Sequence, residues 1–192
     1  MKFRVSNVLF LISLLVVLGG CGGKSAPTRF YMLEAGSASP SLTQASPVVI
    51  LEEVTIPPYL DRPNIVTRTS GARVHLAEFD YWAEPLRDAV ARHLLMELSR
   101  ASGATVIVAH SVERDFTLKV AMLRFDATED GQAILQAMWR LEPYQEQSGG
   151  SAKSWRHASY SEKATDSSYA AIVNAQSRLL SKLAEEIATS IK

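Results

Sequence analysis

The chain has 192 residues, of which 20 are basic, 20 are acidic and 47% are hydrophobic. This length suits one domain, and these fractions are those of a folded protein rather than a disordered one. A net charge of zero excludes a general nucleic-acid binder, which needs a basic surface. The single cysteine, Cys21, excludes an internal disulfide and any site built from several thiolates.

The first twenty residues have the pattern of a secretory signal peptide. Lys2 and Arg4 form a short positive segment, and residues 8–18 are apolar apart from Ser13. As a helix this run would reach only ~16 Å, short of the ~30 Å hydrocarbon core. The sequence therefore favours a cleaved signal peptide at residues 1–20 over a transmembrane anchor.

The residues around the cysteine resemble a bacterial lipobox. Leu18, Gly19 and Gly20 precede Cys21, and small residues at such a place let a peptidase approach the backbone. An ordinary signal peptide followed by a chance cysteine is the alternative. We predict that Cys21 carries a diacylglycerol and an N-acyl chain, because its position, its flanking residues and its being the single cysteine all agree. An anchor with several acyl chains holds stably where a single chain does not.

The segment after the cysteine is short and bears on localisation. Residues 21–28 form a lipidated tether, of which the last seven residues extend over at most ~25 Å. By resemblance to the enteric sorting rule, Gly22 favours the periplasmic side of the outer membrane, because Asp at that place signals inner-membrane retention. The mature chain has 18 basic and 20 acidic residues, which excludes a polybasic lipid-binding patch.

The mature chain contains eight segments with strand patterns. Pro57 and Pro58 end the second of them, because proline cannot donate to a ladder, and Ser70-Gly71 suits a hairpin. Residues 35–47 indicate a loop. The strands are expected at residues 29–34, 48–56, 65–68, 73–78, 105–109, 116–122, 135–141 and 154–162.

Two further segments have helical periodicity. In residues 82–101 apolar side chains recur every four positions, with Pro85 in the expected first turn and Gly103 at the expected end. Residues 169–191 carry a second apolar stripe, and residues 166–168 offer N-cap oxygens. We therefore predict one α+β domain at residues 29–192, a two-layer sandwich of a mainly antiparallel sheet and two long amphipathic helices.

The histidines offer little chemistry. They are scattered along the chain, and among them only His93 is spaced i,i+4 from a carboxylate, Glu97, on the first predicted helix. This pair could hold a metal ion, but a third ligand is lacking and a solvated helix face is the favoured interpretation. Hydrolase and nucleotide-binding motifs are absent. We predict no enzyme activity, no catalytic residue and no metal site.

Acidic residues also cluster near Gly131. Asp126, Glu129 and Asp130 precede this glycine in what resembles a hairpin loop. A weak cation site and a solvated turn are both compatible with the pattern, and the solvated turn is favoured.

A proline-rich segment, IPPYLDRPNIVTR at residues 56–68, has three prolines in thirteen residues. Prolines reduce conformational freedom, so the segment is either a loop that caps the sheet, with Tyr59 and Leu60 in the core, or a preorganised surface for a partner. The candidate partner contacts are Tyr59, Leu60, Asp61 and Arg62, followed by Tyr81 and Trp82, although core packing is favoured for Trp82.

Four features resemble one known family in their order along the chain. They are the lipobox ending at Cys21, RFYML at residues 29–33, the proline-rich segment, and FDYWAEPL at residues 79–86. Together they are similar to the ABC-type transport auxiliary lipoproteins, the family of the C-subunit of the paraquat-inducible operon. This resemblance implies an α+β fold similar to the N-terminal domain of periplasmic Tol-type proteins.

The resemblance also implies a function in lipid transport. The protein would dock an MCE (mammalian cell entry) domain protein of the same system at the outer membrane and support envelope integrity. MCE proteins form rings, so a matching homo-oligomeric ring is an expectation of the same kind. No cofactor is implied beyond the acyl chains on Cys21. The alternative is a structural or assembly lipoprotein of another envelope complex.

Overall fold

The computed structural model describes residues 26–36, 46–70, 72–108, 113–144 and 154–191. The predicted signal peptide, the lipobox with Cys21, most of the tether and His110 lie outside these residues. So do most of the predicted loop at residues 35–47 and the glycine of the predicted Ser70-Gly71 turn.

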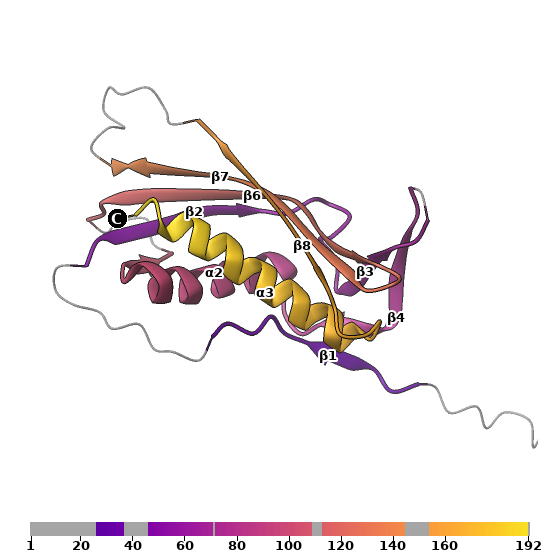
Figure 1. Ribbon diagram of the computed structural model, residues 1–192. Coiled ribbons are helices and arrows are strands. Elements are labelled where there is room, and N and C mark those ends of the chain that lie inside the picture. The colour runs from indigo at the N-terminus through magenta and orange to yellow at the C-terminus, as the bar shows by residue number, and fades with distance from the viewer. Residues whose placement is uncertain (1–25, 37–45, 71, 109–112, 145–153, 192) are drawn as a thin grey trace, which may run out of the picture.

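The described residues form two helices and one eight-stranded sheet (Figure 1). Figure 1 shows β1, β3 and β4 at one end of the molecule and the C-terminus at the other. The strands are β1 (Arg29–Tyr31), β2 (Val48–Thr55), β3 (Asn64–Arg68), β4 (Val74–Trp82), β5 (Thr105–Ile107), β6 (Phe116–Thr128), β7 (Gln132–Pro143) and β8 (Arg156–Lys163), and the helices are α2 (Leu86–Ser102) and α3 (Tyr169–Ala188).

The sheet is mixed: its longest ladders are antiparallel, and shorter ladders are parallel. Strands β6, β7 and β8 form the predicted antiparallel meander, and β3 pairs antiparallel with β4. However, β2 pairs parallel with both β5 and β6, β3 pairs parallel with the end of β6, and β1 pairs parallel with β4. The α+β class is confirmed. The parallel pairs were not foreseen, because alternation of apolar side chains carries no information on strand direction.

Helix α2 begins and ends at the residues that the sequence marks. Pro85 immediately precedes it, and the Pro85 carbonyl accepts hydrogen bonds from the N–H groups of Asp88 and Ala89. Gly103 ends it with a left-handed φ of 71°, a conformation that glycine adopts without steric cost. The predicted start at residue 82 was four residues early, because β4 continues through Trp82.

Helix α3 begins at a side-chain cap and lies along α2 on one face of the sheet (Figure 1). The hydroxyl of Ser168 accepts a hydrogen bond of 3.2 Å from the Ala171 N–H, as the N-cap prediction required. The apolar stripe of α3 packs on β7 and β8. Its buried members include Ile172, Leu179, Leu180, Leu183 and Ile187.

The turn between β6 and β7 requires glycine. Gly131 has a φ of 85°, and a Cβ atom built on it would lie 3.0 Å from the backbone oxygen of Asp166. The turn and the approach to helix α3 therefore depend on the same residue. On the inner face of the meander, large side chains fill the space under the helices; among them are Leu118, Phe125, Leu135 and Trp139.

Candidate functional site

A buried carboxylate holds the proline-rich segment to the sheet. Asp126 is fully buried on β6 and accepts hydrogen bonds from Arg68 Nε at 2.7 Å, Arg124 Nε at 2.8 Å and the Tyr59 hydroxyl at 2.9 Å. Burial, and after it the charge of Asp126, raise the pKa of Tyr59, so the phenol keeps its proton and donates it. The Arg68 guanidinium also lies 5.3 Å from the centre of the Tyr59 ring.

This network corrects the prediction for the acidic cluster. Asp126 does not lie in a solvated turn, because β6 extends through Thr128 and pairs Asp126 with Ile134 of β7. Glu129 and Asp130 do lie in the exposed turn. In the part of the chain that the structure describes, no three His, Cys, Asp or Glu side chains are arranged to hold a metal ion.

A second buried carboxylate fastens the first strand to the body. Asp80 on β4 accepts two hydrogen bonds from the Arg29 guanidinium, at 2.7 and 2.8 Å, and one of 2.7 Å from the Tyr31 hydroxyl. Burial alone would raise the pKa of Asp80, but these bonds outweigh it and hold the pKa below its usual value. Two of the motifs that carry the family resemblance are thus joined directly, and β1 is locked to β4.

The chain beyond β1 is held by the helices. Leu33 is buried in the core, and its carbonyl accepts a hydrogen bond of 3.1 Å from Arg92 of α2. The Glu34 N–H donates to the Ser177 hydroxyl of α3 at 3.1 Å, and the Gly36 N–H donates to the Glu97 carboxylate. Glu97 is therefore a buried acceptor for the backbone.

The solvated-face interpretation of His93 and Glu97 is wrong, because both side chains are buried between α2 and neighbouring segments. His93 Nε2 lies 3.2 Å from the hydroxyl of Ser181 on α3, and Nδ1 has no hydrogen-bond partner among the described residues. Burial disfavours the charged ring and lowers the pKa of His93 to about 4, although the charge of Glu97 opposes this.

The free energy of unfolding should therefore fall in mild acid. Below pH 6.5 an unfolded histidine takes up a proton, whereas folded His93 stays neutral until its pKa of about 4. Stability is lost as the pH falls through this window, by about 2 kcal/mol between pH 6.5 and pH 5. Urea titrations of the wild type and His93→Gln at several pH values measure this slope, which the variant should lose.

The matched control is His157→Gln, which changes an exposed histidine on β8. It should keep the wild-type slope. An unchanged slope in His93→Gln would show that another group causes the acid sensitivity.

The two motif segments line one groove of about 380 Å³. The Trp82 N–H donates to the Pro63 carbonyl at 2.7 Å, and the Ala83 N–H donates to the Tyr31 carbonyl at 2.9 Å. The first bond brings the proline-rich segment to the end of β4, and the second holds β1 beside it. The groove is lined by Asp61, Arg62 and Pro63 from one segment and by Trp82, Ala83, Glu84, Pro85 and Leu86 from the other.

The groove has an apolar floor and a charged rim. Trp82 and Leu86 are buried beneath it, while Asp61 is exposed and pairs with Arg87 of α2 at 3.1 Å. Glu84 pairs with Arg92 at 2.6 Å. Both ion pairs are solvent-accessible, so they add little stability and remain available to a partner.

The structure separates the six predicted contact residues into two groups. Leu60 and Trp82 are only 2% and 6% exposed, and Tyr59 is turned to Asp126, so these three side chains pack inward. Asp61 is exposed, and Arg62 and Tyr81 are half-buried. The interpretation that Tyr59 and Leu60 pack into the core is therefore confirmed. Of the predicted partner contacts, Asp61 is exposed and Arg62 and Tyr81 are half-exposed.

Sequence reasoning missed the remaining groove residues. Pro63, Glu84 and Pro85 lie in the quoted motifs, but none of the three was named as a candidate contact residue. Asp61 and Arg62 were found because they add a charge pair to the proline-rich segment, which the prolines could hold as a preorganised surface. One sequence signal could have indicated them: both motifs, although far apart in the chain, contain a proline beside a charged residue.

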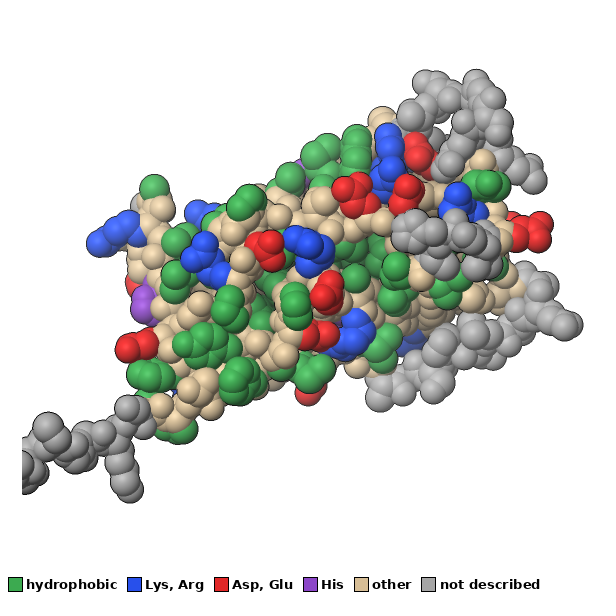
Figure 2. Space-filling view, turned by 180° about the vertical axis from the view of Figure 1, so that it is seen from behind, with side chains coloured by type: hydrophobic (Ala, Val, Ile, Leu, Met, Phe, Trp, Pro, Cys, Tyr) green, Lys and Arg blue, Asp and Glu red, His purple; other side chains and the backbone are tan. Residues whose placement is uncertain are grey.

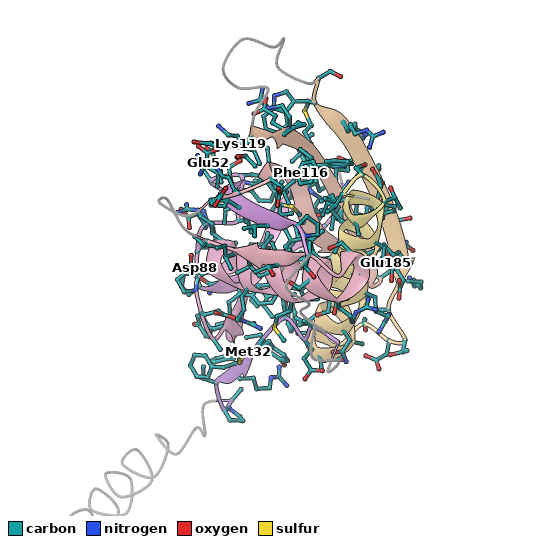
Figure 3. All side chains as sticks on the ribbon, turned by 90° about the vertical axis from the view of Figure 1, so that its left-hand side faces the viewer. Met32, Glu52, Asp88, Phe116, Lys119 and Glu185 are labelled. Atoms are coloured by element: carbon teal, nitrogen blue, oxygen red, sulfur yellow. The ribbon has the colours of Figure 1, made fainter. Side chains whose placement is uncertain are left out.

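The outer faces of the molecule mix charged and apolar side chains. Figure 2 shows hydrophobic side chains gathered near the first described residues of the chain, and charged groups spread over the middle of the same view. Figure 3 shows Met32 on the opposite side of the molecule from Glu52 and Lys119. Neither of the described helices is long and apolar enough to cross a membrane.

Comparison with known proteins agrees with this fold. Two crystal structures have the same fold: an uncharacterized protein, with a TM-score of 0.72 and 22% identity over 87% of this chain and 100% of that one, and a protein from Xanthomonas campestris, with a TM-score of 0.67 and 17% identity over 84% and 93%.

Sequence comparison identifies the family. The intermembrane transport lipoproteins PqiC of Escherichia coli K12 and of Shigella flexneri are each 27% identical to this chain over 128 residues, which is 65% of this chain and 68% of theirs. Residues 31–188 match the family model of the ABC-type transport auxiliary lipoprotein component. The chain therefore belongs to the family of ABC-type transport auxiliary lipoproteins.

Proposed function

We propose that this protein is a periplasm-facing lipoprotein subunit of an MCE-type lipid transport system. Cys21 anchors it in the outer membrane, and the folded domain docks the MCE component and so supports envelope integrity. Family membership supports a transport auxiliary lipoprotein, which is not an enzyme family by its description. The relatives that are named for intermembrane transport support a location of this protein between two membranes.

The groove carries this proposal. Segments 61–63 and 82–86 are separated by eighteen residues of chain, yet the hydrogen bond from Trp82 to Pro63 brings them together around one apolar floor with Asp61, Arg62 and Glu84 at its rim. A buried apolar centre with a polar rim is the usual anatomy of a protein-binding site. The prolines of both segments limit the conformational freedom that binding would otherwise cost.

The anchor and the groove act together. Acyl chains on Cys21 keep the domain at one membrane, which raises its effective concentration for a partner that reaches across from the other membrane. Assembly of several copies into a ring would multiply this avidity. No step of this function requires a reaction, so the side chains of the groove bind and orient rather than catalyse.

Reversing one rim charge should weaken docking. Asp61→Lys places a second cation beside Arg87 while leaving the core intact, because Asp61 is exposed. We expect the amount of MCE protein recovered with this variant to fall roughly ten-fold. Affinity purification from detergent-solubilised envelopes, followed by quantitative immunoblotting of the MCE protein, measures the loss.

The matched control is Glu185→Lys, which reverses an exposed carboxylate that is also paired with an arginine, Arg100 at 3.5 Å. Glu185 lies on α3, away from the groove. Recovery of equal amounts of MCE protein with both variants would show that the groove does not take part in docking. Recovery of an unrelated envelope complex and of no MCE protein with the wild type would instead favour a structural or assembly lipoprotein.

A further inference from the structure

An apolar surface is left uncovered on the first strand. Phe30 is 66% exposed and Met32 is 51% exposed, although both are large hydrophobic side chains. The ring of Tyr81 on β4 lies 6.0 Å from that of Phe30, centre to centre, and extends the surface. We refer to Phe30, Met32 and Tyr81 as the β1 patch. Figure 3 shows Met32 at the margin of the molecule, and Figure 2 shows the hydrophobic side chains around this region.

The contacts of the first strand hold this patch outward in the described domain. Arg29 and Tyr31 alternate with Phe30 along the strand and are bound to Asp80, so the face that β1 turns inward is set. Beyond the strand, Leu33 is buried in the core, which leaves Met32 outward. An apolar surface that the fold holds outward in this way indicates a binding surface.

We propose that the β1 patch lies against the lipid surface in which Cys21 is anchored. This inference rests on the lipidation assumed in the proposed function. Phe30 follows Cys21 by only nine residues, which span at most ~32 Å when fully extended. Among the large hydrophobic side chains that are exposed in the described domain, Phe30 and Met32 therefore come first after the anchor along the chain.

The charge of this segment suits phospholipid headgroups. Residues 21–33 contain Lys24 and Arg29 and no acidic residue. The Arg29 side chain is 60% exposed, whereas its partner Asp80 is 5% exposed, so the charge presented to the outside is positive. Aromatic side chains beside cationic ones are typical of the boundary between headgroups and acyl chains, where phosphates accept hydrogen bonds from arginine.

Contact with lipid would set the orientation of the groove. β1 pairs with β4 from Arg29 to Tyr31, and β4 leads directly from Tyr81 to Trp82 in the groove lining. The Ala83 N–H also donates to the Tyr31 carbonyl. Because strand pairing and this hydrogen bond join the patch to the groove, a domain resting on the β1 patch holds the groove at a defined height and direction above the membrane, instead of turning freely on its tether.

Site-specific fluorescence tests the proposal on the full lipidated chain. Met32→Cys, labelled with an environment-sensitive dye, is reconstituted into vesicles of phosphatidylethanolamine and phosphatidylglycerol with and without brominated acyl chains. Glu52→Cys is the control, since Glu52 is exposed on β2 and lies on the opposite side of the molecule (Figure 3). We expect brominated lipid to reduce the emission of the Met32 label about two-fold and to leave the Glu52 label unchanged.

Flotation of the same vesicles reports the anchor separately. A chain that does not float is not lipid-anchored, and this result would overturn both the proposed function and the contact. The chain could instead float but show no quenching at position 32, or equal quenching at both positions. This result would support the anchor and overturn the proposed lipid contact. A label at position 32 that is blue-shifted without quenching indicates burial by a second copy or a partner and also overturns the proposal.

Discussion

Cys21→Ala is expected to abolish stable membrane attachment and, with it, membrane-dependent function. Each buried CH₂ group contributes about 0.8 kcal/mol to lipid binding, so the loss of several acyl chains removes far more binding energy than the β1 patch could replace. Metabolic labelling with palmitate and fractionation of the envelope measure attachment. An envelope-integrity assay, such as survival in detergent, measures function.

The matched control for this variant is Gly23→Ala, a small change in the same tether that leaves the lipobox unaltered. It should be labelled and fractionate like the wild type. A Cys21→Ala protein that is released as a soluble periplasmic form and still supports full envelope integrity would contradict the tether mechanism, because docking would then need no anchor.

Asp126→Ala should cause the largest loss of stability among the substitutions considered. Asp126 is fully buried, and its removal leaves the guanidinium groups of Arg68 and Arg124 and the hydroxyl of Tyr59 without their shared acceptor. Breaking a buried ion pair from one side costs about 3–5 kcal/mol. Because the two arginines are partly exposed and water can reach them, we expect the lower end of this range.

Urea denaturation followed by circular dichroism measures this loss as a lower midpoint with an unchanged slope. The control is Asp130→Ala in the neighbouring turn, where an exposed carboxylate pairs with exposed Lys163 at 2.6 Å. It should leave the midpoint unchanged, because exposed pairs contribute little. Equal midpoints for Asp126→Ala and the wild type would show that the network around Asp126 is not needed for stability.

The same network connects stability to docking. Tyr59 and Arg68 belong to the proline-rich segment, and Asp126 fixes both to β6. Loss of the carboxylate should therefore also loosen Asp61 and Arg62 at the groove, which Leu60 separates from Tyr59 in the chain. In contrast, Asp61→Lys changes only the rim of the groove. Comparing it with Asp126→Ala therefore distinguishes a loss of stability from the loss of a partner contact.

Most elements were predictable from the sequence because they depend on local signals. Strand β2 ends shortly before Pro57, Gly103 caps the end of α2 and Ser168 caps the start of α3, for reasons that lie within a few residues. The predicted ends of strands were less accurate where a strand continued beyond the residues with clear alternation of apolar and polar side chains. β6 was expected to end at residue 122 and ends at Thr128, because pairing with β7 continues past a register shift between Met122 and Arg124.

The candidate site was less predictable, since its members are identified by partners distant in sequence. Asp61 and Arg62 were found from a local turn pattern, but Asp126 was assigned to a solvated turn, and its partner Arg68 comes from another strand. His93 and Glu97 were assigned to a solvated helix face, although α3 and the segment beyond β1 cover them. Periodicity shows which face of an element is apolar, but not which polar side chains lie under a second element.

By itself, the sequence determined the α+β class, the position of the elements, the family resemblance and the expectation of an anchor at Cys21. These follow from hydrophobic period, caps, prolines and short motifs, all of which act between residues that are near in the chain. Only the tertiary structure decided that the sheet is mixed, that Asp80 and Asp126 are buried acceptors, and that residues 61–63 and 82–86 share one groove. The physical reason is that burial and strand direction depend on contacts between segments far apart in the chain.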